Sequence, residues 1–352
     1  MPAVVEQVLL AEPRGFCAGV EMAIKALTWM TRVFTPPVYC YHQIVHNAAV
    51  VAVFAAAGVV FVDDVAAVPA GAPLMLSAHG SAPAVVREAA LRGAVVVDAV
   101  CPLVTKVHHE VRRMAAGGYQ VLYVGHAGHD EAVGTIAEAP HAVTLLDPEN
   151  GLGDLPAADP SRVALLAQTT LGHHEWEGVL ASARRRFPAL WTARKSDLCY
   201  ATTNRQAAVE ALAERADLVL VVGSANSSNT RALVRVARSA GARAERVEGP
   251  ASIDAGWLHG AQVVGVTAGA SAPDGSVQAV VSALAPRRGV EVVRVTSEEE
   301  YFPPPPQLRA LLVALQAAVE GGCSARLPGR PGPLDDDRSW GAAGALELLG
   351  AG

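Results

Sequence analysis

Short apolar runs alternate along most of the chain with longer amphipathic stretches. The runs are rich in valine and leucine, whereas stretches such as 84–93 and 177–187 carry apolar residues at helical spacing. Continuous apolar strands that alternate with helices are typical of parallel sheets covered by helices on both faces. The pattern therefore predicts an α/β protein with parallel-type sheets, whose ligands gather at the carboxyl ends of the strands.

Three cysteines occupy equivalent positions in this pattern. Cys17, Cys101 and Cys199 each stand where an apolar run gives way to a helical pattern, and a polar cluster follows each of them after 28 or 29 residues. These clusters are His46-Asn47, His129-Asp130-Glu131 and Ser227-Ser228-Asn229. A third set of junctions, LMLSAHGSAP, VALLAQTTLG and VVGVTAGASAP, closes each unit. A fixed internal period predicts the architecture, here three αβα units in a pseudo-threefold arrangement around one central site.

We expect these repeat units at 1–100, 101–198 and 199–292, each with one of the three cysteines. The remaining segment, 293–352, contains four consecutive prolines, which cannot lie inside a helix or a central strand. A helical apolar pattern follows at 307–322. Beyond it, proline, glycine and acidic residues predict a loosely ordered extension with a possible short terminal helix.

Composition excludes several classes of protein. The chain has 352 residues, 51% of them hydrophobic, which is ample for a large core. A net charge of −6 argues against nucleic acid as a partner, since that needs a basic footprint. The longest apolar stretch, 48–62, is interrupted by Gly58 and is too short for a membrane span, so we expect a helix from Asn47 and then a strand. With no export signal recognised, a soluble cytoplasmic protein is expected.

The five cysteines are an odd number, which makes a disulfide framework unexpected. Cys40 lies inside an apolar strand and is expected to be a small buried hydrophobe, while Cys323 has no partner signal. A thiolate at a helix N-terminus is stabilised by the helix dipole, which favours metal binding at the other three. The alternative is three unrelated buried thiols. Soft thiolates suit zinc or an iron–sulfur cluster, and three ligands leave one position open for substrate.

Hydrogen-bond donors suited to an anion follow several strands. They are His46, His79, Ser227, Ser228, Asn229 and Ser271. This set at strand ends and helix N-termini indicates a phosphate site without lysine, for a small and highly anionic molecule. Plain helix capping is the alternative for 227–229, although capping and anion binding use the same geometry.

Glu131 is the one strong acid–base candidate in these clusters. A carboxyl group that is buried near other negative charge has a raised pKa and can hold a proton near neutral pH. It could then pass that proton through a hydroxyl group, and 168–170 (Gln-Thr-Thr) belongs to the same repeat unit. The alternative is that Glu131 only caps a helix that begins near Ala132.

Nine motifs, taken together and in order, resemble the 4-hydroxy-3-methylbut-2-enyl diphosphate reductase family over roughly residues 8–310. The motifs are PRGFCAGV, VHN, SAHG, CPLVTKVH, GHAGHDEAVGT, QTT, CYATTNRQ, NSSN and TAGAS. The resemblance implies a trefoil of three αβα domains around a [4Fe–4S] cluster, in the last enzyme of the methylerythritol phosphate route to isoprenoids.

The resemblance also implies a role for each matched residue. Cys17, Cys101 and Cys199 would bind three irons, and the fourth iron would bind the substrate hydroxyl. The diphosphate would be held by His46, His79, Ser227, Ser228, Asn229 and Ser271. Glu131, with Thr169 and His129, would supply the proton with which the hydroxyl leaves as water. Two electrons, typically from ferredoxin or flavodoxin, would complete the formation of isopentenyl and dimethylallyl diphosphate.

One departure and three rival readings bear on this resemblance. Val100 stands where the family usually has a small polar residue, which could alter the packing or potential of the cluster. A zinc hydrolase or lyase would use the same cysteines around a zinc-bound water, and a non-catalytic iron–sulfur sensor would not need Glu131. A nicotinamide dehydrogenase is disfavoured because no GxGxxG follows the first strand.

Overall fold

The computed structural model describes residues 4–153, 155, 159–194, 196–322, 334 and 337–350. The chain divides into two compact units. One comprises Met1–Cys17 and Leu103–Glu299, and the other comprises Ala18–Pro102 and Glu300–Gly352. We call them the Cys199 unit, which also contains Cys17, and the Cys101 unit, which also contains Cys40. Cys323 lies outside the described residues.

Three sheets account for the strands, and all the strand pairs described are parallel. This confirms the expected α/β class and parallel pairing. It follows from the apolar runs, because strands buried on both faces need apolar side chains on both faces.

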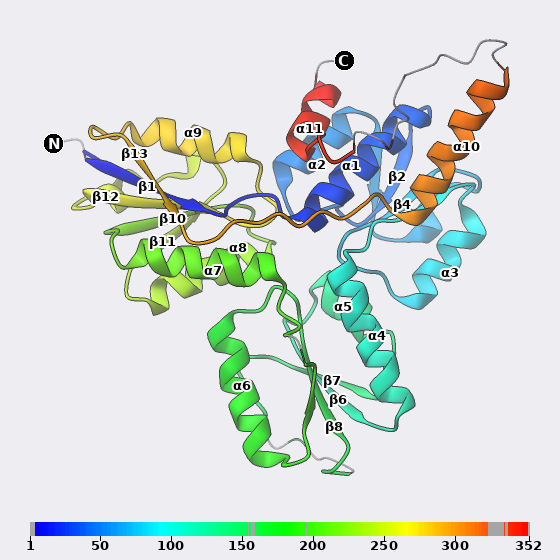
Figure 1. The fold of residues 1–352 in the computed structure, drawn as a ribbon, viewed down its shortest axis with the longest axis horizontal. Helices are drawn as coiled ribbons and strands as arrows, with labels where there is room; N and C mark the ends of the chain where they lie inside the picture. Colours follow the sequence, from blue (N-terminus) through cyan, green and yellow to red (C-terminus); the bar gives the residue numbers. More distant parts are fainter. Residues whose placement is uncertain are drawn as a thin grey trace. The chain divides into compact units, whose positions relative to one another are not determined.

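The five-stranded sheet of the Cys199 unit has the order β11-β10-β12-β1-β13. Its strands are β1 (Gln7–Glu12), β10 (Leu218–Val222), β11 (Arg243–Val247), β12 (Val263–Ala268) and β13 (Val290–Arg294). Helices α7 (Tyr200–Ala213) and α8 (Ser228–Ser239) cover one face, and α9 (Asp274–Leu284) covers the other (Figure 1).

A second sheet of the Cys199 unit has the order β7-β6-β8-β9. Its strands are β6 (Gln120–Val124), β7 (Val143–Leu146), β8 (Val163–Ala167) and β9 (Trp191–Thr192). One face packs on α4 (Pro102–Ala116) and the other on α6 (His173–Arg186), while α5 (Asp130–Ile136) follows β6. The amphipathic stretch at 177–187 thus forms most of α6, as predicted.

The sheet of the Cys101 unit has the order β3-β2-β4-β5. Its strands are β2 (Val38–Tyr41), β3 (Val59–Val62), β4 (Leu74–Leu76) and β5 (Val96–Asp98). Its helices are α1 (Ala18–Val33), α2 (Ala48–Ala56) and α3 (Pro83–Arg92), and a 3₁₀ turn spans Val65–Ala67. Asn47 caps α2, and Cys40 is fully buried in β2, so both expectations for these residues are confirmed.

The first strand does not follow the expected division of the chain. Residues 1–100 were expected to form one repeat unit, but β1 pairs with β12 and β13 of the sheet that contains residues 218–294. An apolar run predicts that a strand forms, but it does not predict which strands pair with it. Any other strand of similar length offers the same backbone hydrogen-bonding groups. The division into three repeat units itself stays a prediction.

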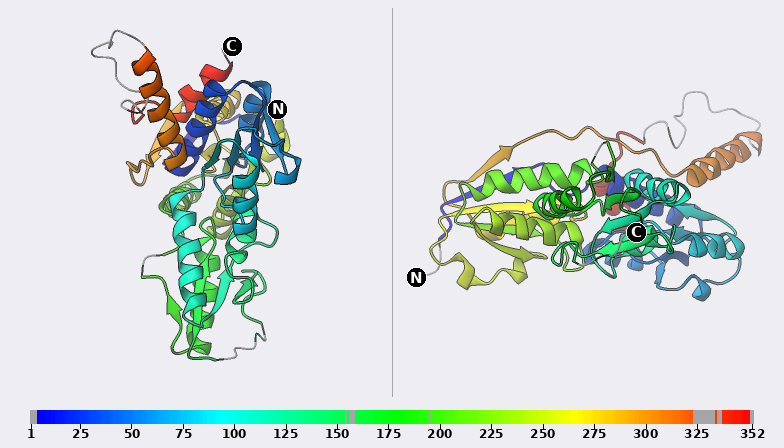
Figure 2. Two further views of the ribbon diagram at one scale, coloured as in Figure 1. Left: turned by 90° about the vertical axis from the view of Figure 1, so that its right-hand side faces the viewer. Right: turned by 90° about the horizontal axis from the view of Figure 1, so that it is seen from below.

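The C-terminal segment belongs to the Cys101 unit. Helices α10 (Pro306–Gly322) and α11 (Ala342–Gly350) confirm the two helices expected there. Helix α11 packs beside α1, as the left view of Figure 2 shows, and the Trp29 and Trp340 rings meet edge to face with centroids 5.8 Å apart. Within the described residues, α11 and Trp340 are therefore packed parts of this unit, while most of the segment that was expected to be loosely ordered lies outside the described residues.

A buried ion pair fixes this segment. The Lys25 ammonium of α1 donates to the Asp337 carboxylate at 2.7 Å and also to the Asp337 backbone carbonyl, with both side chains at most 5% exposed. The Tyr301 hydroxyl donates to the same carboxylate oxygen at 2.7 Å. Removing one partner would leave the other charge buried and uncompensated.

We therefore expect Lys25→Met to lower the free energy of unfolding by about 3–5 kcal/mol. Amide hydrogen exchange of α11 should accelerate strongly, because the Asp337 carboxylate loses its cation. Arg92→Met is the matched control, since Arg92 pairs with Glu88 on an exposed face of the same unit and should cost at most about 0.5 kcal/mol. Equal losses in the two variants would contradict this role of the pair.

Candidate active site

The buried carboxyl group of Glu131 is the centre of the site in the Cys199 unit. Glu131 lies in the first turn of α5, the helix that follows β6 after a short loop, and is 2% exposed. Thr169 follows β8 in the same sheet. Its backbone N–H donates to one carboxylate oxygen at 2.7 Å, and its hydroxyl donates to the other at 3.0 Å. The expected pairing of an acid with a hydroxyl group is therefore present.

Burial raises the pKa of Glu131 to about 7. Desolvation is the largest cause, because a buried carboxylate loses its hydration. The two hydrogen bonds from Thr169 lower the pKa, and the nearby Asp197 carboxyl raises it. Glu131 can thus hold a proton at neutral pH and release it to a base, as a general acid must.

His129, rather than Glu131, caps helix α5. The His129 Nδ1 atom accepts a hydrogen bond from the Glu131 backbone N–H at 3.2 Å. A neutral ring whose Nδ1 accepts must carry its proton on Nε2. The cap therefore leaves the Glu131 carboxyl to Thr169 and fixes one tautomer of the histidine.

Cys199 caps helix α7 with its thiol. Its sulfur accepts from the Thr202 backbone N–H at 3.3 Å and lies 3.0 Å from the Thr202 hydroxyl. The pKa of Cys199 is raised to about 11, chiefly by burial and next by the nearby Cys17. A metal ion bound here would displace the proton, since thiolates are the ligands.

Cys17 lies in the loop that follows β1. Its backbone N–H donates to the carbonyl of Ala270 at 3.2 Å, in the loop after β12. The Cys199 backbone N–H donates to the Thr169 carbonyl at 3.0 Å, in the loop after β8. Cys17 and Cys199 are close enough for the electrostatic coupling noted above. In the described part of the chain neither forms a disulfide. This donor set fits a soft metal centre.

The N-terminus of α8 carries the three consecutive residues predicted to hold an anion. The Ser227 hydroxyl caps the helix by accepting from Thr230 N–H at 3.3 Å, so the capping alternative holds for this residue. Ser228 accepts at 3.2 Å from the Gln168 amide. The Asn229 side chain accepts from Ala270 N–H at 2.9 Å. These contacts position the helix end without excluding an anion.

Ser271 lies in the loop after β12 and is 7% exposed. It is next to Ala270, whose carbonyl accepts from Cys17 and whose N–H donates to Asn229. One short loop therefore touches both the thiol region and the end of α8.

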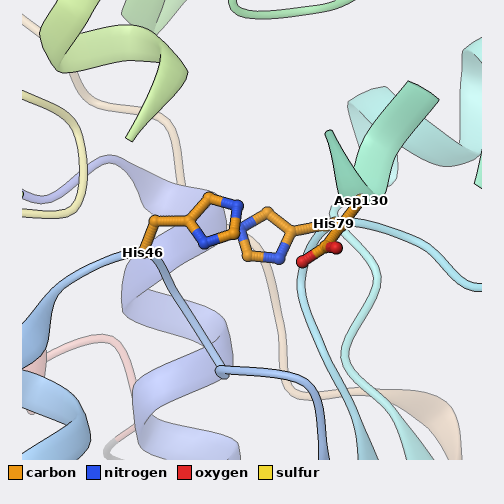
Figure 3. Close-up of side chains that lie close together, drawn as sticks. All are labelled: His46, His79 and Asp130. Carbon is orange, nitrogen blue, oxygen red and sulfur yellow. The ribbon is translucent and has the colours of Figure 1, made fainter. Parts of the chain in front are cut away.

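The remaining predicted residues belong to the Cys101 unit. His46 and His79 stack with ring centroids 3.8 Å apart and an angle of 15° between the rings, as Figure 3 shows. The Cys101 backbone N–H donates to the carbonyl of Ala78 at 3.0 Å, so Cys101 lies beside the loop of His79. Val100 N–H donates to Asp98 at 3.0 Å, so the unusual valine is held through its backbone.

Two residues of the site were not among the sequence candidates. Gln168 accepts from His126 N–H at 3.0 Å and donates to Thr170 and Ser228, which ties the end of β8 to α8. Asp197 is 5% exposed and accepts from Lys106 and from Ala167 N–H. Both lie within or beside the motifs, but their sequence gives no sign of these long-range partners.

The raised pKa of Glu131 predicts a pH-dependent stability. The pKa of Glu131 in the folded protein, about 7, exceeds the ordinary value of 4.5. The contribution of this group to the free energy of unfolding is therefore fully present below pH 4.5 and is lost as the pH rises through about 7. Glu131→Gln removes this titration. Its melting temperature, in full-length protein freed of metal, should gain a few degrees relative to wild type between pH 5 and pH 8. A difference that stays constant with pH would contradict the raised pKa.

The fold and the site define an α/β enzyme that gathers thiols, a protonated carboxyl and helix N-termini at its strand ends. A family model, LytB protein, matches residues 8–285. The chain belongs to this family.

Curated relatives carry one name. The chain is 49% identical over 311 residues to 4-hydroxy-3-methylbut-2-enyl diphosphate reductase of Acidothermus cellulolyticus, covering 88% of this chain and 92% of that protein. It is 45% identical over 316 residues to the enzyme of the same name from Streptomyces avermitilis, covering 89% and 94%. It is 47% identical to 4-hydroxy-3-methylbut-2-enyl diphosphate reductase 2 of Mycobacterium tuberculosis over 309 residues, covering 87% and 92%.

Two solved structures are similar. The E-1-hydroxy-2-methyl-but-2-enyl-4-diphosphate reductase of Plasmodium falciparum aligns with a TM-score of 0.85 and 30% identity, covering 89% of this chain and 99% of that one. A second structure, described as (E)-4-hydroxy-3-methyl-but-2-enyl diphosphate reductase, the terminal enzyme of the non-mevalonate pathway, aligns with a TM-score of 0.56 and 28% identity. It covers 80% and 99%. In the described part of this chain, no helix has the length and apolar character that a membrane crossing requires.

Proposed function

We propose that this chain is an oxidoreductase that converts (E)-4-hydroxy-3-methylbut-2-enyl diphosphate to isopentenyl and dimethylallyl diphosphate. The reaction consumes two electrons and two protons, and the hydroxyl group leaves as water. The observation that carries the proposal is the buried Glu131–Thr169 pair in the same unit as Cys17 and Cys199. An allylic hydroxyl is a poor leaving group until it is protonated, and a carboxyl with a pKa of about 7 is suited to that step.

Glu131 is the proposed proton donor. A protonated Glu131 can donate to the Thr169 hydroxyl, which can in turn donate to a substrate hydroxyl, so that one hydrogen-bonded pair carries the proton. His129 keeps the first turn of α5 in place, and it has a proton on Nε2 to donate when its ring is neutral. Burial excludes water from the carboxyl and keeps it protonated near neutral pH.

A [4Fe–4S] cluster is the proposed cofactor, with Cys17, Cys101 and Cys199 as its three protein ligands. When bound, such a cluster supplies single electrons and one iron without a protein ligand. Support comes from the absence of disulfides among the described cysteines, the coupling of Cys17 with Cys199, and the Thr202 N–H aimed at the Cys199 sulfur. A small iron–sulfur or flavin protein, ferredoxin or flavodoxin, is the proposed electron donor, and the proposed location is the cytoplasm.

Six residues are proposed to hold the diphosphate. They are His46, His79, Ser227, Ser228, Asn229 and Ser271. Support comes from the N-terminus of α8, where backbone N–H groups and the helix dipole favour negative charge.

The first test is the content of iron, sulfide and zinc per chain in protein purified without oxygen. Equal iron and sulfide, near four each or near three with a labile site, is expected. Stoichiometric zinc without sulfide, persisting after attempted cluster reconstitution, would replace the reductase with a zinc enzyme. Product formation from the diphosphate substrate with a chemically reduced viologen then tests the reaction without requiring the natural donor.

A further inference from the structure

Arg205 is a charged side chain that the proposed reaction does not use, yet it is 0% exposed. It lies on α7, the helix that Cys199 caps. Burying a guanidinium group is costly unless its donors and its charge are both satisfied. The contacts of the Arg205 guanidinium therefore indicate which parts of the structure it holds in place.

All five N–H groups of Arg205 have acceptors in the Cys199 unit. Nε and Nη2 donate to the Gly15 carbonyl at 3.1 and 2.8 Å, and Nη2 also donates to the Phe16 carbonyl at 3.4 Å. Nη1 donates to the Ala201 carbonyl at 2.9 Å and to the Glu298 carboxylate at 2.8 Å. The planar fork of arginine is required to reach such a set at once.

Two of these acceptors directly precede Cys17. Gly15 has a φ of +68°, and a Cβ placed there would lie 3.1 Å from the Ala272 carbonyl, so the loop turns in a conformation that suits glycine. In such a loop the carbonyl groups do not pair with a neighbouring strand and need other hydrogen-bond donors. Arg205 donates to these carbonyl groups and holds them against α7. Cys199 caps the N-terminus of this helix, about two turns before Arg205.

The Glu298 carboxylate neutralises the buried charge. It lies 2.8 Å from Arg205 and also accepts from the Asn204 amide at 3.1 Å. Glu298 comes after β13, in the segment that leads away from the five-stranded sheet (Figure 1). One guanidinium thus joins the Cys17 loop, the Cys199 helix and the chain beyond β13.

We propose that Arg205 is a positioning residue that holds Cys17 at a fixed place relative to Cys199, so that both thiols meet one metal centre. This inference rests on the proposed cluster ligands for its purpose. The hydrogen bonds by which Arg205 holds the Cys17 loop do not depend on a bound metal.

The test compares full-length Arg205→Met, Arg205→Lys and Arg215→Met with wild type, all purified without oxygen. Arg215 is the matched control, because it follows the same helix and pairs with Glu291 on the surface. The first readout is the rate at which a chelator removes iron. The second is the alkylation rate of each cysteine by iodoacetamide after metal removal, resolved by peptide mass spectrometry, with circular dichroism to check the fold.

Arg205→Met is expected to release iron about ten-fold faster, the loss typical when a group that orients a ligand is removed. Cys17 should be alkylated several-fold faster, while Cys101 and Cys40 stay at their wild-type rates. Arg205→Lys should rescue little, because an ammonium group cannot replace the fork. Wild-type Cys17 alkylation in a folded Arg205→Met protein would overturn the proposal, and so would full rescue by lysine.

A second variant covers the case in which Arg205→Met does not fold. Glu298→Gln keeps an acceptor oxygen but removes the counter-charge. It should accelerate alkylation of Cys17 to a smaller extent than Arg205→Met does, and it should leave the other cysteines at their wild-type rates. Unchanged rates at Cys17 in this variant and in Arg205→Lys would overturn the proposal. If wild-type protein holds no iron and sulfide, the proposed function fails, whereas the alkylation readout still decides the role of Arg205.

Discussion

Glu131→Gln is expected to lower kcat by about 10²–10⁴-fold while leaving iron and sulfide content at the wild-type level. Glutamine has nearly the same shape as the buried carboxyl group and can still accept from the Thr169 N–H, but it has no proton to release. The measurement is product formation with a chemically reduced viologen, together with iron and sulfide analysis of the same preparation.

The control for this variant is Glu138→Gln. Glu138 lies near the end of the same helix, where it pairs with Arg112 and His108 away from Thr169. It should keep most of the wild-type turnover, although the loss of a well-paired carboxylate lowers stability. Near-normal turnover by Glu131→Gln would remove Glu131 from the path of the proton.

The pH dependence of turnover gives an independent check. With a pKa of about 7, Glu131 is protonated below that pH and ionised above it, so kcat limited by its proton should fall as the pH rises through about 7. In Glu131→Gln, the remaining kcat should no longer fall as the pH rises through about 7. A wild-type profile that is flat between pH 6 and pH 8 would argue that another group supplies the proton.

Cys199→Ser is the second change with a large expected effect, and it should reduce iron and sulfide to near background. The hydroxyl group of serine is a hard ligand and a much weaker acid than a thiol, so it replaces a thiolate poorly at a soft metal centre. Helix α7 should nevertheless form, because serine is a good helix cap and can accept from Thr202 N–H. The loss is therefore expected in metal content and not in secondary structure.

The matched control is Cys40→Ser, a cysteine that is fully buried in β2 and offers no ligand. It should lose stability, because a hydroxyl group is buried in place of a thiol, but it should keep iron and sulfide in the folded fraction. Cys17→Ser and Cys101→Ser are expected to behave as Cys199→Ser does. Full iron and sulfide content in Cys199→Ser would contradict the proposed ligand set.

The sequence by itself determined the secondary structure and the chemistry of the loops. Apolar runs fill both faces of parallel strands, so they locate β10 and β12 without knowledge of their partners. The cap at Asn47, the burial of Cys40 and the helix at α10 follow from local rules of the same kind. Most candidate residues of the loops could be named from the sequence because polar side chains stand out at the ends of apolar strands, whereas Gln168 at the end of β8 was not among them.

Only the tertiary structure decided which distant groups meet. The pairing of β1 with β12, and of Lys25 with Asp337 across 312 positions, depends on how sheets and helices assemble. Arg205 illustrates the same limit, because an arginine on a helix is expected on the surface until its carbonyl and carboxylate partners are known. Burial likewise gives Glu131 its pKa of about 7. A sequence specifies the groups, whereas desolvation and long-range contacts, which set their energies, arise only when the chain is folded.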